Sequence, residues 1–377
     1  MPLPIAIIGA GIGGLTTALT LKQQGFAVAV FESAAELKPV GAGIILASNA
    51  MQVLKKLGLA EKLELRGTAI STLKITDAQL QPLSVASLTN FEAQYQVKSL
   101  AIHRGELQRV LAQDIGPENI HLAKRLVTIE KGVLCHLTFE DGTTVRAQHV
   151  IGADGIKSVV RNQVFGENPI RKANQWCWRG ICGIDLPARY HHELNEAWGQ
   201  GERFGFVPLG PGRVYWYALS TTKTAPDADL RQLFRDFHPD ILRIIAATPA
   251  GQIVGAEITD LEPLKTWQAG NVCLLGDAAH ATTPNLGQGA GQAIEDAYVL
   301  GLCLKRQPEM PQAFRQYEQL RRKKATAVVN SSWQIGQLAH IDNRAGAWCR
   351  NQVLKRMPKS LNRKQMKMLF SLDYAQC

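Results

Sequence analysis

The sequence predicts an α/β protein with two domains and a helical C-terminal segment. A glycine-rich turn joins a strand to a helix near the N-terminus, a second such turn comes late in the chain, and short aromatic-rich alternating runs lie between them. With 377 residues, of which 46% are hydrophobic and 20% charged, the chain can bury a core large enough for two domains.

The first strand-to-helix turn contains the pattern Gly9-x-Gly11-x-x-Gly14, with Gly13 beside the last glycine. A buried strand precedes it, a helix follows, and a second strand ends at Glu32. The glycines permit a tight turn, close approach of a pyrophosphate and close packing of helix on strand, and the acid can bind a ribose 2′-OH. The pattern therefore predicts a dinucleotide site, although it does not separate FAD from NAD.

Residues 272–291 hold the second turn, where a short apolar strand ends at Gly276-Asp277. An aspartate at the carboxyl end of a strand can accept hydrogen bonds from sugar-type hydroxyl groups. A glycine-rich bend then opens a helix, and its unpaired N–H groups point toward an anion or an electron-rich carbonyl. The bend contains Gly287, Gly289, Ala290 and Gly291.

A third motif, residues 150–161, is a strand that ends in Gly-Ala-Asp-Gly and passes into a helix. Asp154 in this motif can tie together loops near a pyrophosphate. Alternatively, Asp154 and Arg161 form a structural ion pair, and the residues alone leave both interpretations open.

The run GDAAHATTPNLGQG at residues 276–289, together with the two other motifs, resembles the class A FAD-dependent aromatic hydroxylases. These are flavoprotein monooxygenases of the para-hydroxybenzoate, salicylate and urate hydroxylase type. The resemblance covers residues 3–335 and implies FAD as cofactor, NADH or NADPH as co-substrate, and O₂. It also implies that a flavin C4a-hydroperoxide hydroxylates a small aromatic or heteroaromatic substrate.

The resemblance further implies which residues bind FAD. Asp277 corresponds to the residue that holds the ribityl chain, and Arg104, between a strand and a helix, corresponds to an FAD contact. The loop 41–45 is either a lining of the flavin site or an ordinary connection. The cofactor-binding candidates are Gly9, Gly11, Gly13, Gly14, Glu32, Ser33, Gly43, Arg104, Leu126, Asp154, Asp277, Gly287, Gly289, Ala290 and Gly291.

An aromatic-rich region, residues 166–265, is expected to form the substrate sheet. In a hairpin around residues 210–212, Arg203, Tyr215 and Tyr217 share one face, where an arginine can pair with an acidic or carbonyl-bearing ligand. Arg203 and Tyr215 are therefore the catalytic candidates. Arg203 matches an arginine of the urate-hydroxylase branch, but that branch has an amide residue where this chain has Arg179, which weighs against urate itself.

The predicted architecture is a Rossmann-like FAD-binding domain with an inserted antiparallel β-sheet substrate domain and a C-terminal helical segment. The FAD-binding domain takes residues 1–70, 101–165 and 266–335, the substrate domain 71–100 and 166–265, and the basic helical segment 336–377. Smaller expectations are a hairpin at Asp141-Gly142, an amphipathic helix over residues 230–245, a helix capped by Asn49, and a long helix over 311–338.

The net charge of +10 is concentrated in the tail, because residues 340–377 hold eight Lys/Arg against two Asp/Glu. The rest of the chain therefore gives little support for binding nucleic acid. The basic tail could lie on an anionic membrane or dock a partner, but packing on its own protein is the favoured interpretation. No oligomeric state is predicted.

Seven cysteines without a CxxC pair indicate reduced thiols and a cytoplasmic setting. No run of 18 apolar residues is present, a strand begins at once after the N-terminus, and no metal-ligating spacing is found.

Two rival functions remain at this point. One is a flavin epoxidase or reductase of an isoprenoid or other lipid-like substrate, which the basic tail would suit. The other is a non-catalytic flavin-bound interaction protein. A flavin halogenase is less favoured, because its WxWxIP motif is not found after Trp176, and His280 is expected to order its turn instead of acting as a base.

Overall fold

The computed structural model describes residues 3–37, 42–223, 226–307, 309–372 and 374, and it confirms the mixed α/β architecture. One sheet of six strands has the order β18-β19-β12-β1-β2-β8, in which β1 runs parallel to β2 and β12, and β12 runs parallel to β19. Carboxyl ends of parallel strands meet at one edge of a sheet, so the three glycine-containing motifs converge there. The strands are β1 (Ile5–Ile8), β2 (Val28–Phe31), β8 (Ile120–His121), β12 (Val150–Gly152), β18 (Gln268–Ala269) and β19 (Val272–Leu274).

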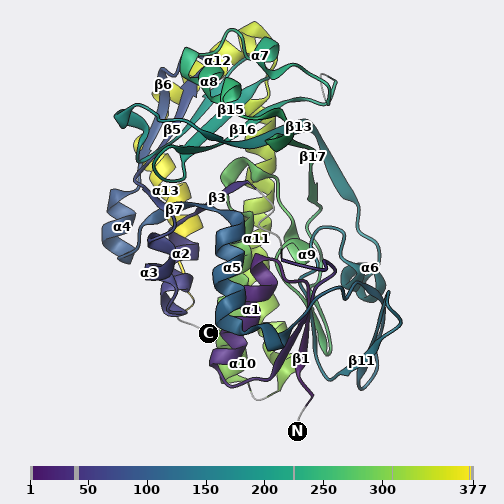
Figure 1. Cartoon of the computed structure of the whole chain (residues 1–377). Helices are drawn as coiled ribbons and strands as arrows, with labels where there is room; N and C mark the ends of the chain where they lie inside the picture. The colour runs from purple at the N-terminus through teal and green to yellow at the C-terminus, as the bar shows by residue number, and fades with distance from the viewer. Residues whose placement is uncertain (1–2, 38–41, 224–225, 308, 373, 375–377) are drawn as a thin grey trace.

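Long helices cover this sheet. Helix α1 (Ile12–Gln23) packs on α10 (Gly289–Arg306) so closely that a Cβ on Gly301 would lie 2.4 Å from the Thr20 methyl carbon. Helix α11 (Met310–Ala339) runs through the centre of the molecule, as Figure 1 shows, and reaches both large sheets. The predicted helix over residues 311–338 is therefore confirmed.

The second large sheet has seven strands in the order β17-β13-β16-β15-β14-β5-β6. All neighbouring strands are antiparallel except β14 and β5, which run parallel, so the antiparallel prediction is wrong for this pair. A long stretch of chain separates β5 from β14, and only such a connection can bring two strands together in parallel. The strands are β5 (Thr72–Asp77), β6 (Pro82–Ser87), β13 (Ile170–Gly183), β14 (Glu193–Trp198), β15 (Arg203–Pro208), β16 (Arg213–Thr221) and β17 (Val254–Leu261).

One face of the seven-stranded sheet is sealed by two short helices, α7 (Leu230–Leu233) and α8 (Pro239–Ala246), over a core that contains Phe204, Phe206 and Trp216. The prediction of one continuous helix here is wrong. Pro239 lacks the N–H that a helix interior needs but suits a first turn, and the His238 ring accepts a hydrogen bond of 3.1 Å from the Asp240 N–H. The other face is left for the ligand site.

Two smaller sheets complete the β-structure. One has the order β3-β7-β4. The other has the order β11-β10-β9 and contains the predicted hairpin at Asp141-Gly142, where Gly142 takes the positive φ of +80° that the turn requires. The strands are β3 (Gly43–Leu46), β4 (Thr68–Ile70), β7 (Ser99–His103), β9 (Leu126–Glu130), β10 (Cys135–Phe139) and β11 (Thr144–Ala147).

The C-terminal segment forms two helices, α12 (Arg344–Arg356) and α13 (Lys359–Phe370), that pack against the rest of the protein. The favoured interpretation of the basic tail is thus confirmed. Within the described ranges, no helix is both long and apolar enough to cross a bilayer. The remaining helices are α2 (Ser48–Lys56), α3 (Ala60–Glu64), α4 (Thr89–Tyr95), α5 (Arg104–Ile115), α6 (Val159–Phe165) and α9 (Asp277–His280).

Candidate active site

The N-terminal glycines form an open cradle at the end of β1. A Cβ on Gly14 would lie 2.0 Å from the Gly9 carbonyl oxygen, and one on Gly9, whose φ is +105°, would lie 2.5 Å from the Ala153 oxygen. In contrast, a Cβ on Gly11 would meet no atom within 4 Å. Gly9 and Gly14 therefore need to be glycine for the fold. Gly11 instead borders free space, which is what a turn that admits a pyrophosphate requires.

Glu32 joins the end of β2 to this cradle. Its carboxylate accepts hydrogen bonds from the Ala10 N–H at 2.7 Å, the Ala34 N–H at 2.9 Å and the Ser33 hydroxyl at 3.1 Å. The carboxylate still has lone pairs for a ribose hydroxyl, since two oxygens can accept about four hydrogen bonds. Behind the cradle, the Gln108 side chain donates to the Ala10 carbonyl at 2.8 Å, a support that the sequence did not reveal.

Asp154 caps helix α6 instead of pairing with Arg161. It accepts from the Ser158 hydroxyl at 2.5 Å and the Val159 N–H at 2.7 Å, and burial raises its pKa while these hydrogen bonds oppose the rise. The buried Arg161 guanidinium donates to the carbonyls of Ala278, at 3.1 Å, and Ile156, at 2.6 Å. The alternative of an Asp154–Arg161 ion pair is therefore wrong, and Arg161 instead links the second and third motifs.

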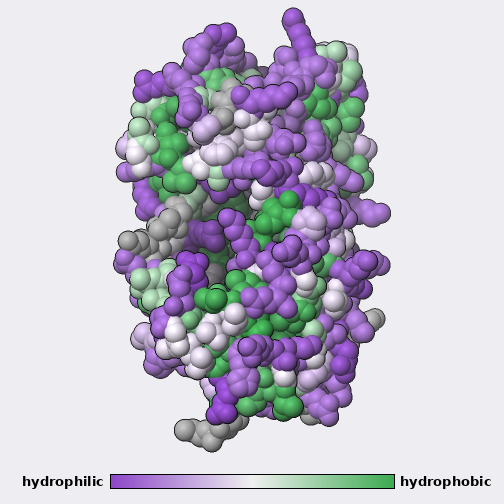
Figure 2. All heavy atoms as spheres, turned by 90° about the vertical axis from the view of Figure 1, so that its right-hand side faces the viewer, coloured by the Kyte–Doolittle hydropathy of each residue, from purple (hydrophilic) through white to green (hydrophobic). Residues whose placement is uncertain are grey.

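Asp277 lies at the end of β19, where its side chain is exposed to solvent. Protein atoms nevertheless crowd it and raise its pKa, while His280 and then Arg104 oppose that rise. A side chain can be exposed to solvent and still be surrounded by protein atoms when it lies in an open recess. Figure 2 shows a hollow in the surface at mid-height. Asp277 and Arg104 are thus close in space although 173 positions apart in the sequence.

A buried polar network supports the glycine-rich bend from behind. Asp296 accepts from the Gly276 N–H at 3.0 Å, from the His280 ring at 2.5 Å and from Arg321 Nε at 2.7 Å. Burial alone would raise the pKa of Asp296, but His280 and Arg321 outweigh burial and lower it to about 2. His280 therefore orders the turn, as expected, and is not free to act as a base.

Asn49 belongs to this network and does not cap helix α2, so that prediction is wrong. The helix begins at Ser48, and the buried Asn49 amide donates to Gln288 at 3.1 Å and to Glu295 at 3.0 Å. The sequence signal for the network was the acidic pair Glu295-Asp296, which follows apolar residues of the helix; the structure shows both side chains fully buried.

The side of the seven-stranded sheet opposite α7 and α8 carries the predicted arginine and tyrosines. The register sets Arg203 opposite Leu219 and Gly205 opposite Tyr217, which confirms that Arg203, Tyr215 and Tyr217 share one face. Arg203 is only 2% exposed, and it donates to Glu196 at 3.2 Å and to Asn285, in the loop before α10, at 2.7 Å. The Arg203 charge is thus already compensated.

Two further side chains define this face. The Tyr217 hydroxyl donates to Glu196 at 2.7 Å, and burial raises the pKa of that hydroxyl, so it stays protonated. Arg179 lies opposite Tyr217, is half-buried, and within the described ranges has no carboxylate at ion-pair distance. The ring of Tyr215 packs against Gly43, where a Cβ would lie 2.5 Å from it, so this face meets the predicted flavin lining.

Not every predicted residue is brought to the recess by its side chain. Leu126 is buried in the main core, and Gly13 separates helices, since its Cβ would lie 3.1 Å from that of Ala293. Ser33 is exposed beside Glu32, and Gly41 lies outside the described residues. Gly287 and Gly289 border open space, because a Cβ on either would meet at most one atom within 4 Å.

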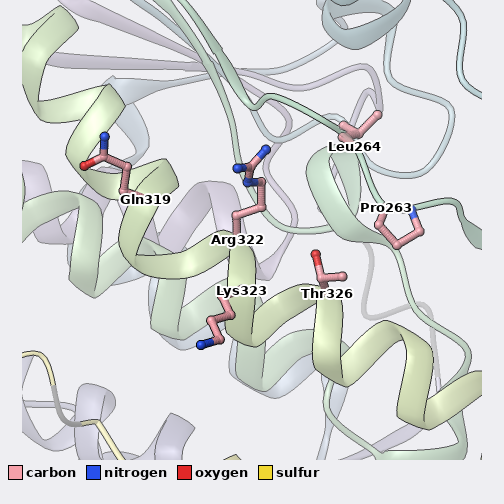
Figure 3. Close-up of a pocket in the computed structure, with 6 residues that line it drawn as sticks. All are labelled: Pro263, Leu264, Gln319, Arg322, Lys323 and Thr326. Atoms are coloured by element: carbon pink, nitrogen blue, oxygen red, sulfur yellow. The ribbon is translucent and has the colours of Figure 1, made fainter.

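A surface pocket of about 350 Å³ lies away from this recess, between the loop after β17 and α11 (Figure 3). Its basic side chain Arg322 is engaged by the Lys265 carbonyl and by Glu318 at 3.7 Å. None of the predicted site residues lines this pocket, so the recess at the strand ends remains the candidate active site. The lining residues are Pro263, Leu264, Gln319, Arg322, Lys323 and Thr326.

The chain matches a family model described as FAD binding domain over residues 3–332. It is 36% identical over 94% of its length to the aurachin C monooxygenase/isomerase of Stigmatella aurantiaca, and covers 94% of that protein. It is 32% identical to the 2-heptyl-3-hydroxy-4(1H)-quinolone synthase of Pseudomonas aeruginosa, with 97% of both proteins covered. The crystal structure of Klebsiella pneumoniae HpxO complexed with FAD and uric acid superposes with a TM-score of 0.89 at 28% identity, covering 96% of this chain and 95% of that chain.

A dinucleotide cradle, a recess at its edge and a sheet wall with arginine and tyrosine side chains define a flavoprotein hydroxylase. The chain belongs to the class A FAD-dependent aromatic hydroxylases and is an FAD-dependent monooxygenase, with NAD(P)H as its reductant. It is thus an enzyme, which removes the rival of a non-catalytic interaction protein.

Proposed function

We propose that this enzyme hydroxylates a bicyclic heteroaromatic substrate that bears a ring carbonyl, of the 4-quinolone type. The proposal rests on a difference between two arginines on the substrate-facing side of the sheet: one has a carboxylate partner and the other has none in the described part of the chain. Arg203 is compensated by Glu196, whereas Arg179 has no such partner in the described part of the chain. One uncompensated guanidinium suits a carbonyl oxygen, which accepts hydrogen bonds without carrying a full charge.

A substrate carboxylate beside Arg203 would compete with Glu196. The carboxylate of Glu196 is 15% exposed and also accepts from the Trp198 indole at 2.8 Å, so it is held in place by three donors. A second carboxylate next to it would place two negative charges in a poorly hydrated site, which is costly. This repulsion favours a neutral heteroaromatic ring over an aromatic acid at the Arg203 end.

The name of one relative supports the same substrate class, because it refers to a 3-hydroxy-4(1H)-quinolone. Aligned coverage of 94% and 97% means that the similarity includes the whole substrate-facing sheet. The departure from the urate-hydroxylase branch at Arg179 points away from a purine.

In this proposal FAD lies in the recess and supplies the oxygen chemistry, while the protein binds, orients and excludes water. Gly11 borders the pyrophosphate, Glu32 the adenosine ribose, and Asp277 the ribityl chain. The first turn of α10 faces the ring system with its N–H groups. Tyr215 and Tyr217 flank the substrate ring, and Arg179 donates to its carbonyl.

The test is a coupled assay of NAD(P)H consumption, peroxide release and oxygenated product with FAD-loaded protein. The panel holds 2-alkyl-4-quinolones, aromatic acids, phenols, purines and an isoprenoid. We expect a quinolone to stimulate NAD(P)H oxidation most and to yield a product one oxygen heavier. Arg179→Gln should lower kcat/KM for that substrate about 10-fold, as the loss of a charge-assisted hydrogen bond implies. Stimulation by aromatic acids or purines alone would overturn the proposal, and stimulation by the isoprenoid alone would favour the lipid rival.

The same proposal includes the division of the chain into FAD-binding, substrate and C-terminal parts given above. It is supported by the membership of the seven-stranded sheet, whose strands come from residues 72–87 and 170–261. A cytoplasmic setting is supported by Cys135, Cys177, Cys182, Cys273 and Cys349, which are free thiols.

A further inference from the structure

The last described residues fold back toward α10, the helix that begins at the glycine-rich bend. Helix α13 ends at Phe370, whose ring packs edge-on against Phe91 at 5.2 Å between centroids. The Gln52 amide donates to the Phe370 carbonyl at 2.9 Å, and Lys324 Nζ donates to the Ser371 carbonyl at 2.7 Å. Figure 1 shows α13 beside α2, so the segment is anchored along its course toward α10.

This course brings the Tyr374 hydroxyl into the buried network behind the recess. The hydroxyl donates to Glu295 Oε1 and accepts from Arg321 Nη1 at 2.5 Å. Glu295 and Arg321 are both fully buried. Burial raises the pKa of the Tyr374 hydroxyl, Arg321 opposes that rise, and Glu295 adds to it, so the hydroxyl remains a donor at neutral pH.

A short chain of hydrogen bonds connects Glu295 to the start of α10. Its second oxygen accepts from the Asn49 amide at 3.0 Å, and the same amide donates to Gln288 Oε1 at 3.1 Å. Gln292 donates to that Gln288 oxygen at 3.1 Å and accepts from Arg321 Nη2 at 2.7 Å. Gln288 directly precedes the first residue of α10.

We propose that Tyr374 is a positioning residue for the flavin, acting through Glu295, Asn49 and Gln288 on the first turn of α10. Its hydroxyl fixes one oxygen of Glu295, which directs the other oxygen toward Asn49. Asn49 in turn holds Gln288 and with it the orientation of the N–H groups that face the ring system. The C-terminal segment is thus part of the cofactor site although it lies behind the site and touches no ligand.

The apolar residues of α13 are consistent with this role. Met366, Leu369 and Phe370 pack into a cluster with Phe91 and Val328, while Arg363 and Lys364 are exposed to solvent. The list of the side chains that hold Glu295 is short: Tyr374, Arg321, Lys324 and Asn49. Tyr374 and Asn49 are the uncharged members of this set, and Tyr374→Phe removes only the hydroxyl while it keeps the ring.

The test compares Tyr374→Phe with Tyr298→Phe, a matched control on α10 whose half-buried ring contacts Lys56. Three readouts are taken on the substrate-free full chain: the FAD dissociation constant, the visible circular dichroism of the bound flavin, and its midpoint potential. In Tyr374→Phe we expect the dissociation constant to rise about 3- to 10-fold, as for one lost hydrogen bond, with changed flavin dichroism and a shifted potential. The control should match the wild type.

Flavin readouts of Tyr374→Phe that equal those of the wild type would overturn the proposal, whether or not the melting temperature of the apoprotein falls. Equal changes in Tyr298→Phe would overturn it as well, because the effect would then not depend on the network. Since no substrate is present, this result is separate from the outcome of the quinolone assay.

Discussion

Arg203 donates a hydrogen bond of 2.7 Å to the side chain of Asn285, and this bond joins the middle of the seven-stranded sheet to the loop that precedes α10. Asn285 is in turn held by the Thr283 hydroxyl and the Ser332 carbonyl, both at 2.9 Å. The seven-stranded sheet and the loop that leads into α10 are therefore connected by hydrogen bonds. A disturbance of Arg203 should reach the flavin as well as the substrate.

Arg203→Met is expected to reduce kcat/KM about 10-fold or more, because one or two charge-assisted hydrogen bonds are lost. We expect a higher KM, a larger fraction of NAD(P)H diverted to peroxide, and FAD still bound. The exposed Arg213, at the start of β16, provides the matched control Arg213→Met. Normal coupling in Arg203→Met would contradict a role for the Arg203–Asn285 link between the sheet and the loop before α10.

The same substitution leaves the Glu196 carboxylate without its cation, which is costly for a largely buried acid. The double variant Arg203→Met/Glu196→Gln should recover thermal stability without recovering coupling. Recovery of both would mean that the single variant failed only through its fold.

Asp277→Ala is expected to weaken FAD binding by about 10- to 150-fold, which corresponds to about 1.5–3 kcal/mol for a hydrogen bond to a charged group. The far-ultraviolet circular dichroism should not change, because the Asp277 side chain is exposed to solvent. Fluorescence titration of the apoprotein with FAD measures the change. An unaltered dissociation constant would assign Asp277 a purely structural role.

Gly11→Val and Gly14→Ala should fail in different ways. Valine at Gly11 enters space that is open in the protein alone, so the apoprotein should keep its melting temperature and lose FAD. Alanine at Gly14 would press its Cβ against the Gly9 carbonyl oxygen at 2.0 Å, so stability itself should fall. Melting curves with and without FAD distinguish the two, and an unstable Gly11→Val apoprotein would contradict this account.

The Asp296 carboxylate should make the stability of the protein depend on pH in the acid range. Its pKa is lowered from 3.8 to about 2, so the folded state holds this proton less tightly than the unfolded state does. The stabilisation is present above pH 4 and is lost as the pH falls toward 2, by about 2 kcal/mol. Denaturant unfolding of the wild type and Asp296→Asn between pH 5 and 2 should show a steeper decline in the wild type; parallel curves would contradict the assignment.

Local patterns in the sequence predicted the cofactor cradle well, because a tight turn and a close helix contact demand glycine whatever surrounds them. Gly9, Gly14 and Glu32 lie where their chemistry requires. The shared face of Arg203 and Tyr217 was likewise predictable, since alternation along a hairpin determines it.

The features that the sequence did not reveal are contacts between residues that lie far apart along the chain. The pairing of Arg203 with Glu196 and Asn285 needs the strand register and a loop 82 residues away. Asn49 has the composition of a helix cap, but burial against Glu295 gives it a different role. The parallel pair of β5 and β14 could not be inferred either, because no local signal distinguishes it from an antiparallel one.

That parallel pair has a consequence for how the molecule reaches its native state. Residues 193–198 and 72–77 must meet before the seven-stranded sheet is complete, and the intervening chain contributes β7, β12 and α5 to other parts of the structure. Such long-range pairing slows folding and leaves β14 as a bare edge until β5 arrives. The seven-stranded sheet therefore cannot be isolated as one continuous fragment without β7, β12 and α5. A nascent chain that stops near residue 265 would already contain every strand of this sheet but not yet α10 or α11.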